Sequence, residues 1–315
     1  MLARVNRAIE LLAQGQAIYY TGPHSGHVLT RAQGRDDAGT WADYINVGME
    51  HGAFDMTGLA AYLQGLVEGG PTRSGHRTPT VIVEAPVNGT DALNVRHNAW
   101  QFRQILGRGA HGILLCQAET ADAVRAFIES CRYPHQEAGL DPALPSPKAR
   151  LDGAKDTSTR RPGTLGRGMR GRGSEGTAAP IWGLTDTEYF ARCDPWPLNP
   201  DGELMLGVKL ESPEGAAQCE EILAVPGLAF AEMGPGDLGL ALGYVTVQRF
   251  PYPPEMRAAR ERIMAACRKN NVAFLEGCTP DTVAARIDEG VRVVSGGTEE
   301  TARAGRAHQR REMPV

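Results

Sequence analysis

Short apolar runs alternate with helix-like segments along most of this chain, and this alternation constrains the fold more than any other feature. The runs end at Gly, Pro or polar residues, as buried strands do. The segments between them carry apolar residues at helical spacing. Eight such units favour a closed (β/α)8 (TIM) barrel over an open doubly wound sheet. The eight runs span residues 17–21, 43–47, 80–84, 112–116, 204–210, 228–233, 272–275 and 291–294.

We expect residues 1–315 to form a single barrel domain, because the pattern repeats from one end of the chain to the other. Residues 298–315 are expected to form a C-terminal helix and tail. The helices are expected near residues 1–15, 27–33, 56–67, 92–106, 121–131, 213–223, 254–269, 281–289 and 298–308.

The alternation breaks between residues 133 and 200, where only residues 185–192 have a helical pattern. Residues 135–180 are predicted to be a long insertion loop rich in Arg, Gly and Pro, because this composition does not easily bury a core. Its arginines could form a lid over an acidic or bulky substrate. A solvated insertion is the favoured interpretation.

Composition excludes several classes of function. A net charge of −4 argues against a general binder of nucleic acids or membranes. No apolar run is long enough to span a bilayer and the N-terminus lacks a signal-peptide pattern, so we expect a cytoplasmic protein. The six cysteines show no zinc-site spacing, and for Cys116, at the end of a strand, packing is favoured over a nucleophilic role.

Two acids follow neighbouring strands of the predicted barrel. Glu211 comes directly after the run 204–210, and Asp237 follows the run 228–233 through Gly-Pro-Gly. Because parallel strands end on the same side, the two carboxylates are expected at one rim, where they could hold a divalent cation. The alternative is that one acid caps a helix and the other belongs to a tight turn.

Other polar residues should reach the same rim. These are Tyr19 or Tyr20, Glu50 with His51, Glu84, Cys116 and Lys209. His51 could act as a general base or be a hydrogen-bonded loop residue. Lys209 lies two residues before Glu211, so both side chains should point to the same face. A buried ammonium there needs an anionic partner.

Five motifs carry a family resemblance, and they occur in the order GMEHGAFDM, RYP, GMRGRGS, KLESPEG and GPGDLGLALGY. In this order and spacing they resemble the metal-dependent class II pyruvate aldolases of the HpcH/HpaI aldolase and citrate lyase superfamily. The resemblance implies a modified TIM barrel, in a homo-oligomer such as a hexamer or trimer of dimers, with the final helix exchanged between subunits.

The resemblance also implies roles for site residues. Glu211 and Asp237 would bind a divalent metal ion, most simply Mg²⁺ or Mn²⁺, with Co²⁺ or Zn²⁺ as alternatives. His51 lies in the segment that is similar to the catalytic loop. The backbone of Gly234, Pro235 and Gly236 would bind a substrate carboxylate. Tyr20 and Glu84 are further candidate substrate-binding residues, and Lys209 is a further candidate catalytic residue.

Three positions depart from the family pattern. Gly48 stands where the family usually has Asp, three residues before the catalytic His. Glu84 stands where an Arg is usual, and Lys209 stands where a Gln is usual. Because the last two changes reverse each other's charge, we expect a Lys209–Glu84 ion pair at the pocket wall. Arg96 is another candidate for the missing Arg.

The expected activity is that of a divalent-metal-dependent carbon–carbon lyase, an aldolase that cleaves or forms a 4-hydroxy-2-oxo acid, or a related compound, through a stabilised enolate. Its partners would be a 2-oxo acid and an aldehyde, without nucleic acid or membrane. One alternative is a Schiff-base aldolase that uses Lys209. The other is a catalytically silent barrel that acts as a binding protein.

Overall fold

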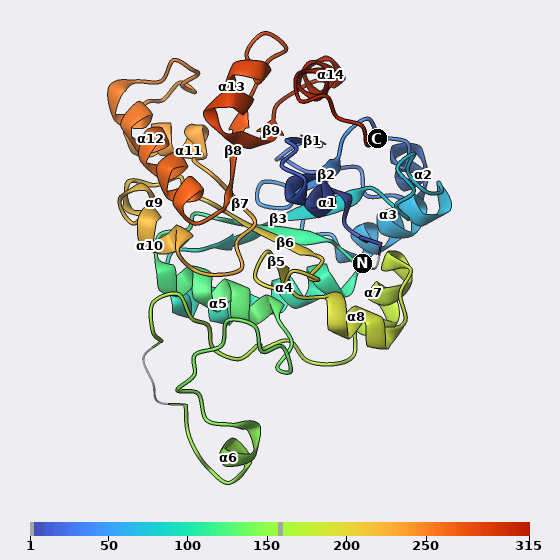
Figure 1. Ribbon diagram of the computed structural model, residues 1–315, viewed down its shortest axis with the longest axis vertical. Helices are drawn as coiled ribbons and strands as arrows, with labels where there is room; N and C mark the ends of the chain where they lie inside the picture. The colour runs from blue at the N-terminus through green and yellow to red at the C-terminus, as the bar shows by residue number, and fades with distance from the viewer. Residues whose placement is uncertain (1–2, 157–159) are drawn as a thin grey trace.

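A closed barrel of parallel strands forms the centre of the computed structural model, which describes residues 3–156 and 160–315 (Figure 1). The strands follow one another around the barrel in the order β4-β3-β2-β1-β9-β8-β7-β6, and a pairing between β4 and β6 closes it. The barrel strands are β1 (Ile18–Thr21), β2 (Tyr44–Gly48), β3 (Thr80–Asn88), β4 (Gly112–Cys116), β6 (Leu204–Lys209), β7 (Phe230–Glu232), β8 (Ala273–Gly277) and β9 (Val291–Ser295).

The eight predicted strands are therefore confirmed, and so is the barrel. The strand pairs β1–β2, β2–β3 and β3–β4 are parallel and consecutive in sequence, as helical crossovers between neighbouring strands require. One strand was not predicted: β5 (Pro195–Trp196) is two residues long and pairs beside β6.

Most predicted helices are present within a few residues of their expected bounds. Several begin at a side-chain cap, because Asp55, Asp91 and Thr120 each accept a backbone N–H of the first turn. None of the helices in the described ranges is long and apolar enough to cross a membrane. The helices that were predicted and are present are α1 (Arg7–Ala13), α2 (Arg31–Asp37), α3 (Met56–Glu68), α4 (Ala92–Gly107), α5 (Ala121–Cys131), α8 (Asp186–Arg192), α12 (Pro254–Lys269), α13 (Val283–Glu289) and α14 (Glu299–His308).

Two details of the helix prediction were wrong. The single helix expected over 213–223 is divided at Gln218 into α9 (Pro213–Ala217) and α10 (Cys219–Leu223). The Gly-Pro-Gly segment is not only a turn, because α11 (Pro235–Ala241) begins there. Gly234 is in the left-handed region with φ 58°, and Pro235 occupies the first helical turn, where a missing N–H costs nothing.

The insertion loop also contains helices that were not predicted, α6 (Pro147–Leu151) and α7 (Glu175–Trp182). Pro180 lies inside α7, and because proline is disfavoured in a helix interior, the sequence did not predict a helix there. In Figure 1, α6 projects away from the barrel below α5. Arg170, by contrast, is buried: it donates to the Tyr189 hydroxyl at 2.8 Å and lies over the Tyr133 ring. It therefore packs within the fold.

The core has two parts, one on each side of the barrel wall. The larger cluster lies between strands and surrounding helices and includes Tyr19. The smaller fills the barrel interior and includes Tyr20, together with Ile9 and Leu11 of α1. Neighbouring strand residues point to opposite faces. Of the two tyrosines considered for the rim, Tyr20 is therefore the one that faces inward.

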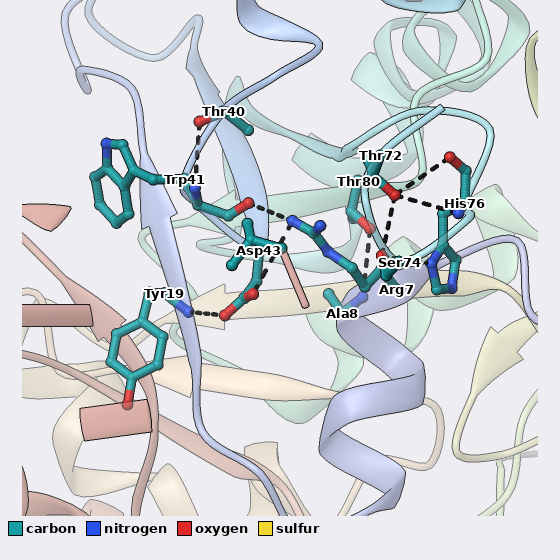
Figure 2. A network of polar contacts seen from close by, with 12 residues as sticks. Arg7, Ala8, Tyr19, Thr40, Trp41, Asp43, Thr72, Ser74, His76 and Thr80 are labelled. Carbon is teal, nitrogen blue, oxygen red and sulfur yellow. Dashed lines mark hydrogen bonds and ion pairs between the residues drawn. The ribbon is translucent and has the colours of Figure 1, made fainter. Parts of the chain in front are cut away.

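A buried polar network, whose part around Arg7 and Asp43 is shown in Figure 2, ties both ends of the chain to the amino-terminal end of the barrel, opposite the strand ends that carry the predicted site. Its centre is Asp43, immediately before β2, which accepts the Tyr19 N–H at 2.9 Å. The Asp43 carboxylate lies 4.0 Å from Arg7 Nη2, 3.3 Å from Arg306 Nη2 and 2.7 Å from Arg311 Nη1. These contacts hold α1, α14 and the C-terminal tail on the chain's own barrel. Exchange of the final helix between subunits stays a prediction.

Candidate active site

A cavity of about 740 Å³ opens at the carboxyl ends of the barrel strands. Its walls come from the segments after β1, β2, β6, β7, β8 and β9, as expected for a site on this fold. Among the predicted site residues, the cavity is lined by His51, Lys209, Glu211, Gly234, Pro235, Gly236 and Asp237. The lining residues that were not predicted include His24 and Glu232.

Lys209 is buried at the end of β6 among acids. Its Nζ lies 2.6 Å from Glu50 Oε2 and 3.8 Å from Glu84 Oε2, so the expected Lys209–Glu84 pair is present. The closer partner is Glu50. Burial alone would lower the pKa of Lys209, but neighbouring groups, which include Glu211 and Glu84, outweigh burial and raise it. Burial acts to raise the pKa of Glu50, yet the pairing with Lys209 lowers it overall.

Glu211 is a strongly perturbed acid of the cavity. One carboxylate oxygen accepts the Gln117 N–H at 2.9 Å, and burial, assisted by the Glu50 charge, raises the pKa of Glu211 to about 8. Gly234 packs directly against it, since a Cβ there would lie 2.5 Å from the Glu211 Cβ. An acid held this way favours protonation or a bound cation over an unpaired charge.

Glu50 connects the two predicted metal ligands. Ligand atoms of Glu50, Cys116 and Glu211 lie within 4.8 Å of one another, and so do those of Glu50, His51 and Asp237. Glu50 belongs to both groups. The sequence predicted Glu211 and Asp237 as the ligands, and the structure adds Glu50 between them.

The chemistry of this donor set fits a hard divalent cation. Carboxylate oxygens are the ligands that Mg²⁺ and Mn²⁺ prefer. In addition, Glu232 Oε2 is buried without a hydrogen-bond partner among the described residues, and burial raises the pKa of Glu232. Four acids, Glu50, Glu84, Glu211 and Glu232, lie around the ammonium of Lys209.

Cys116 adds little to this chemistry. Its thiol is buried and, because of that burial, its pKa is raised well above the usual range. A thiol of this kind is a poor nucleophile. The sequence-based preference for a packing role agrees with this environment.

His51 is on the exposed side of the cavity, with a side chain that is 54% exposed. Its Nε2 lies 3.5 Å from Glu50 Oε2, within salt-bridge range but outside good hydrogen-bond distance. Position 48 is glycine, so no side chain from there orients the ring. Close to its ring lie the side chains of Glu50 and Asp237, with which His51 forms one of the two ligand groups.

His24 occupies a different part of the cavity. It lies between β1 and α2, and its Nδ1 is 2.7 Å from Glu84 Oε1. Its Nε2 is 3.4 Å from the Tyr20 hydroxyl. The hydrogen bond to Glu84 raises the pKa of His24 against the opposing effect of burial. The available sequence signal was its place three residues after the first strand-like run.

Tyr20 and Glu84, two predicted substrate-binding residues, are not among the described residues that line the cavity. Both are buried and contact His24. They can act on a substrate only through His24 or Lys209. This differs from the prediction, and the cause is the course of the β1–α2 segment, which brings His24 between them and the cavity.

The first turn of α11 can still receive an anion. The N–H groups of Gly236 and Asp237 have no acceptor within the helix, as at any helix start. Pro235 has no N–H and contributes only its fixed backbone. The structure thus leaves part of the predicted carboxylate site available.

Two other predictions lie away from the cavity. Arg96 is on α4, and its Nη2 lies 4.0 Å from Glu129 Oε2, so it does not replace the missing Arg at the rim. None of the described residues between 135 and 180 lines the cavity. The alternative of an arginine lid therefore has no contact with the site to support it.

The fold and the acid-rich cavity are those of a barrel lyase family. The chain matches the model of the HpcH/HpaI aldolase/citrate lyase family over residues 87–303, more than half of its length, and it belongs to that family.

Among curated relatives, hydroxypyruvate/pyruvate aldolase of Roseovarius nubinhibens is 22% identical over 238 residues, or 75% of this chain and 71% of that protein. The protein of the same description from Pseudomonas aeruginosa is 26% identical over 219 residues, or 70% of this chain and 60% of its own length.

A solved HpcH/HpaI aldolase/citrate lyase family protein from Burkholderia cenocepacia superposes with a TM-score of 0.64 at 20% identity, covering 97% of this chain and 98% of that one. This likeness supports the fold and does not identify a substrate.

Proposed function

We propose that this chain is a divalent-metal-dependent aldolase that cleaves or forms a 4-hydroxy-2-oxo acid or a closely related compound. The observation that carries the proposal is the pair of ligand groups that share Glu50, one with Glu211 and the other with Asp237, at the carboxyl end of an aldolase-family barrel. The relatives described as hydroxypyruvate/pyruvate aldolases support a small 2-oxo acid as the nucleophilic partner.

The residues that would hold the ion are Glu211 and Asp237, with Glu50 within reach of both. When bound, such an ion supplies Lewis-acid stabilisation of the charge that develops on a ketone oxygen. The N–H groups of Gly236 and Asp237 would orient the substrate carboxylate. The partly buried walls of the cavity would exclude bulk water and strengthen these interactions.

Lys209 would take over the electrostatic role of the missing strand-three Arg. Its ammonium is held at the bottom of the cavity by Glu50 and Glu84. From there it offsets the negative charge of the acids and of an anionic substrate. The same pairing keeps the amine protonated, which disfavours the Schiff-base alternative, because only the neutral amine attacks a ketone.

The binding-protein alternative rests on the basic insertion loop. Arg170 of that loop is buried and Arg167 donates to the Pro145 carbonyl at 3.0 Å, so part of its charge is used within the fold. No observation at the cavity favours this alternative over catalysis.

The test is a screen for aldol cleavage and synthesis with added Mg²⁺, Mn²⁺, Co²⁺ or Zn²⁺, in which pyruvate and hydroxypyruvate are combined with a panel of aldehydes. We expect turnover by the wild type and its loss in Glu211→Ala and Asp237→Ala. Glu221→Ala, an exposed acid on α10, is the matched control. Equal activity in all four proteins would remove the proposed metal site, and no turnover in any of them would remove the proposed activity.

A further inference from the structure

The segment between β1 and α2 brings a histidine–carboxylate pair into the cavity that is separate from the group of Glu50, His51 and Asp237. His24 lines the cavity with a side chain that is 47% exposed, so a bound molecule can reach it. Its partner Glu84 is completely buried in the middle of β3. The exposed ring therefore faces the ligand, and the buried acid holds the ring from behind.

The glycine at position 48 is what allows His24 to be there. A Cβ on Gly48 would lie 2.0 Å from the His24 carbonyl oxygen, and a Cβ on Gly52 would lie 2.6 Å from the Gly26 Cα. The His24 segment thus packs directly on the bare backbone of the last residue of β2 and of the loop after it. An aspartate at position 48, which would orient His51, cannot coexist with this position of His24.

The hydrogen bonds of His24 determine which of its two ring nitrogens carries the proton in the neutral ring. An ionised carboxylate can only accept, so His24 Nδ1 carries the proton given to Glu84, at 2.7 Å. Nε2 is then left with its lone pair. Its neighbour is the Tyr20 hydroxyl at 3.4 Å, which is a weak contact that a substrate hydroxyl can replace. A ring held in this way is arranged to accept a proton at Nε2.

The titratable groups around His24 come from four strands. Glu84 on β3 and Glu232 on β7 favour its protonated form, while Lys209 on β6 opposes it. Tyr20 on β1 is neutral, because burial raises its pKa well above the usual range. The hydrogen bond to Glu84 is the largest influence and raises the pKa of His24.

We propose that His24 is the acid–base residue that moves the substrate proton in this chain, and that Glu84 is the positioning residue that sets its tautomer. This inference rests on the proposed aldolase function and names a residue within that same site. It also accounts for the combination of Gly48 with Glu84, since the first admits the His24 segment and the second anchors its ring.

In the cleavage direction, His24 Nε2 accepts the proton of the C4 hydroxyl. The electron pair of the O–H bond forms the aldehyde carbonyl, and the C3–C4 bond breaks. Its electron pair forms the C2–C3 double bond of the enolate, with the negative charge on the former ketone oxygen. After the aldehyde leaves, His24 returns the same proton to C3, which gives the methyl group of the 2-oxo acid. No oxidant or further reactant is needed.

The first test compares His24→Gln with wild type and with His97→Gln, an exposed histidine on α4. We expect His24→Gln to lower kcat by about 10²- to 10⁴-fold, the usual contribution of a general acid–base group, with a smaller change in KM. His97→Gln should retain wild-type kinetics. Wild-type turnover by His24→Gln would overturn the inference while leaving the proposed function intact.

Chemical rescue separates proton transfer from a structural role. In His24→Ala, imidazole added to the solution can enter the space left beside the cavity, and we expect it to restore part of the lost activity. The corresponding His51→Ala variant should show no such rescue. Rescue of His51→Ala but not of His24→Ala would assign the proton transfer to His51 and overturn the inference.

The positioning role of Glu84 has a readout that does not depend on turnover. Histidine NMR titration should give His24 a pKa above that of an exposed histidine, and Glu84→Gln should lower it. The acid limb of the kcat/KM profile should move to lower pH in that variant by the same interval. An unchanged His24 titration in Glu84→Gln would overturn the pairing, whereas an inactive wild type with an altered titration would overturn the proposed function alone.

Discussion

The carbonyl oxygen of His24 lies where a side chain at position 48 would project, 2.0 Å from a Cβ built on Gly48. The absence of a side chain at position 48 is therefore what makes room for the segment that carries His24. In the family pattern an Asp at this position precedes the catalytic His by three residues. At this cavity, a histidine–carboxylate hydrogen bond instead joins His24 to Glu84.

Gly48→Asp should accordingly destabilise the protein, although it restores the family residue. The contact is with backbone, so the β1–α2 segment must move, and overpacking of this kind costs about 1–3 kcal/mol or more. Urea denaturation measures the change. The control is Gly39→Ala, since a Cβ at Gly39 has no described atom within 4 Å. Wild-type stability of Gly48→Asp would contradict the close packing of His24 on β2.

The fold was predictable because its signals are local. Each strand is a short apolar run, and β-periodicity correctly placed Lys209 and Glu211 on one face. The Lys209–Glu84 pair followed from two opposite charge changes. His24 was not found because its segment is placed by contacts with glycines that follow another strand. Glu50 was recognised at the rim, but its position between two ligand groups depends on the three-dimensional course of its loop.

Lys209→Met should be strongly destabilising. The ammonium is 6% exposed and pairs with Glu50 and Glu84, so its removal leaves buried carboxylates without a counter-charge. Breaking a buried ion pair from one side costs about 3–5 kcal/mol. Thermal and urea unfolding measure the loss. The double variant Lys209→Met with Glu50→Gln removes the nearest unpaired charge and should regain part of the stability; if it is no more stable than the single variant, the pairing with Glu50 has little weight.

Chelation and borohydride distinguish the two aldolase chemistries. We expect EDTA to abolish turnover and added Mg²⁺ or Mn²⁺ to restore it, because Glu50, Glu211 and Asp237 offer carboxylate ligands. Borohydride with pyruvate should leave no adduct on Lys209 in mass spectra, because its acidic neighbours keep the amine protonated. Turnover that survives EDTA and is lost with a borohydride adduct at Lys209 would establish the Schiff-base alternative instead.

Asp43→Asn should lower stability and spare the chemistry. Asp43 is fully buried, and its carboxylate contacts Arg7, Arg306 and Arg311 at the end of the barrel opposite the cavity. Loss of its charge leaves buried guanidinium groups uncompensated, at a cost of about 3–5 kcal/mol. The exposed Asp36→Asn is the control for unfolding measurements. At a temperature where the variant is folded, kcat should equal that of the wild type; a selective loss of kcat would link this end of the barrel to catalysis.

His111 should make the protein less stable in acid. It is completely buried, stacks on Trp182 and accepts the Val81 N–H at 3.2 Å through Nδ1. Burial lowers the pKa of His111 to about 3, from an ordinary value of 6.5.

Below about pH 6.5, His111 therefore binds a proton in the unfolded chain but not in the folded chain. Its contribution to the stability of the fold is complete above that pH and is lost as the pH falls toward 3. The slope attributable to one such group is about 1.4 kcal/mol per pH unit. Urea unfolding between pH 7 and 4 measures it as the difference between wild type and His111→Gln, which has no titrating group at this position. His97→Gln should keep the wild-type slope, and an equally steep slope in His111→Gln would show that other groups cause the acid sensitivity.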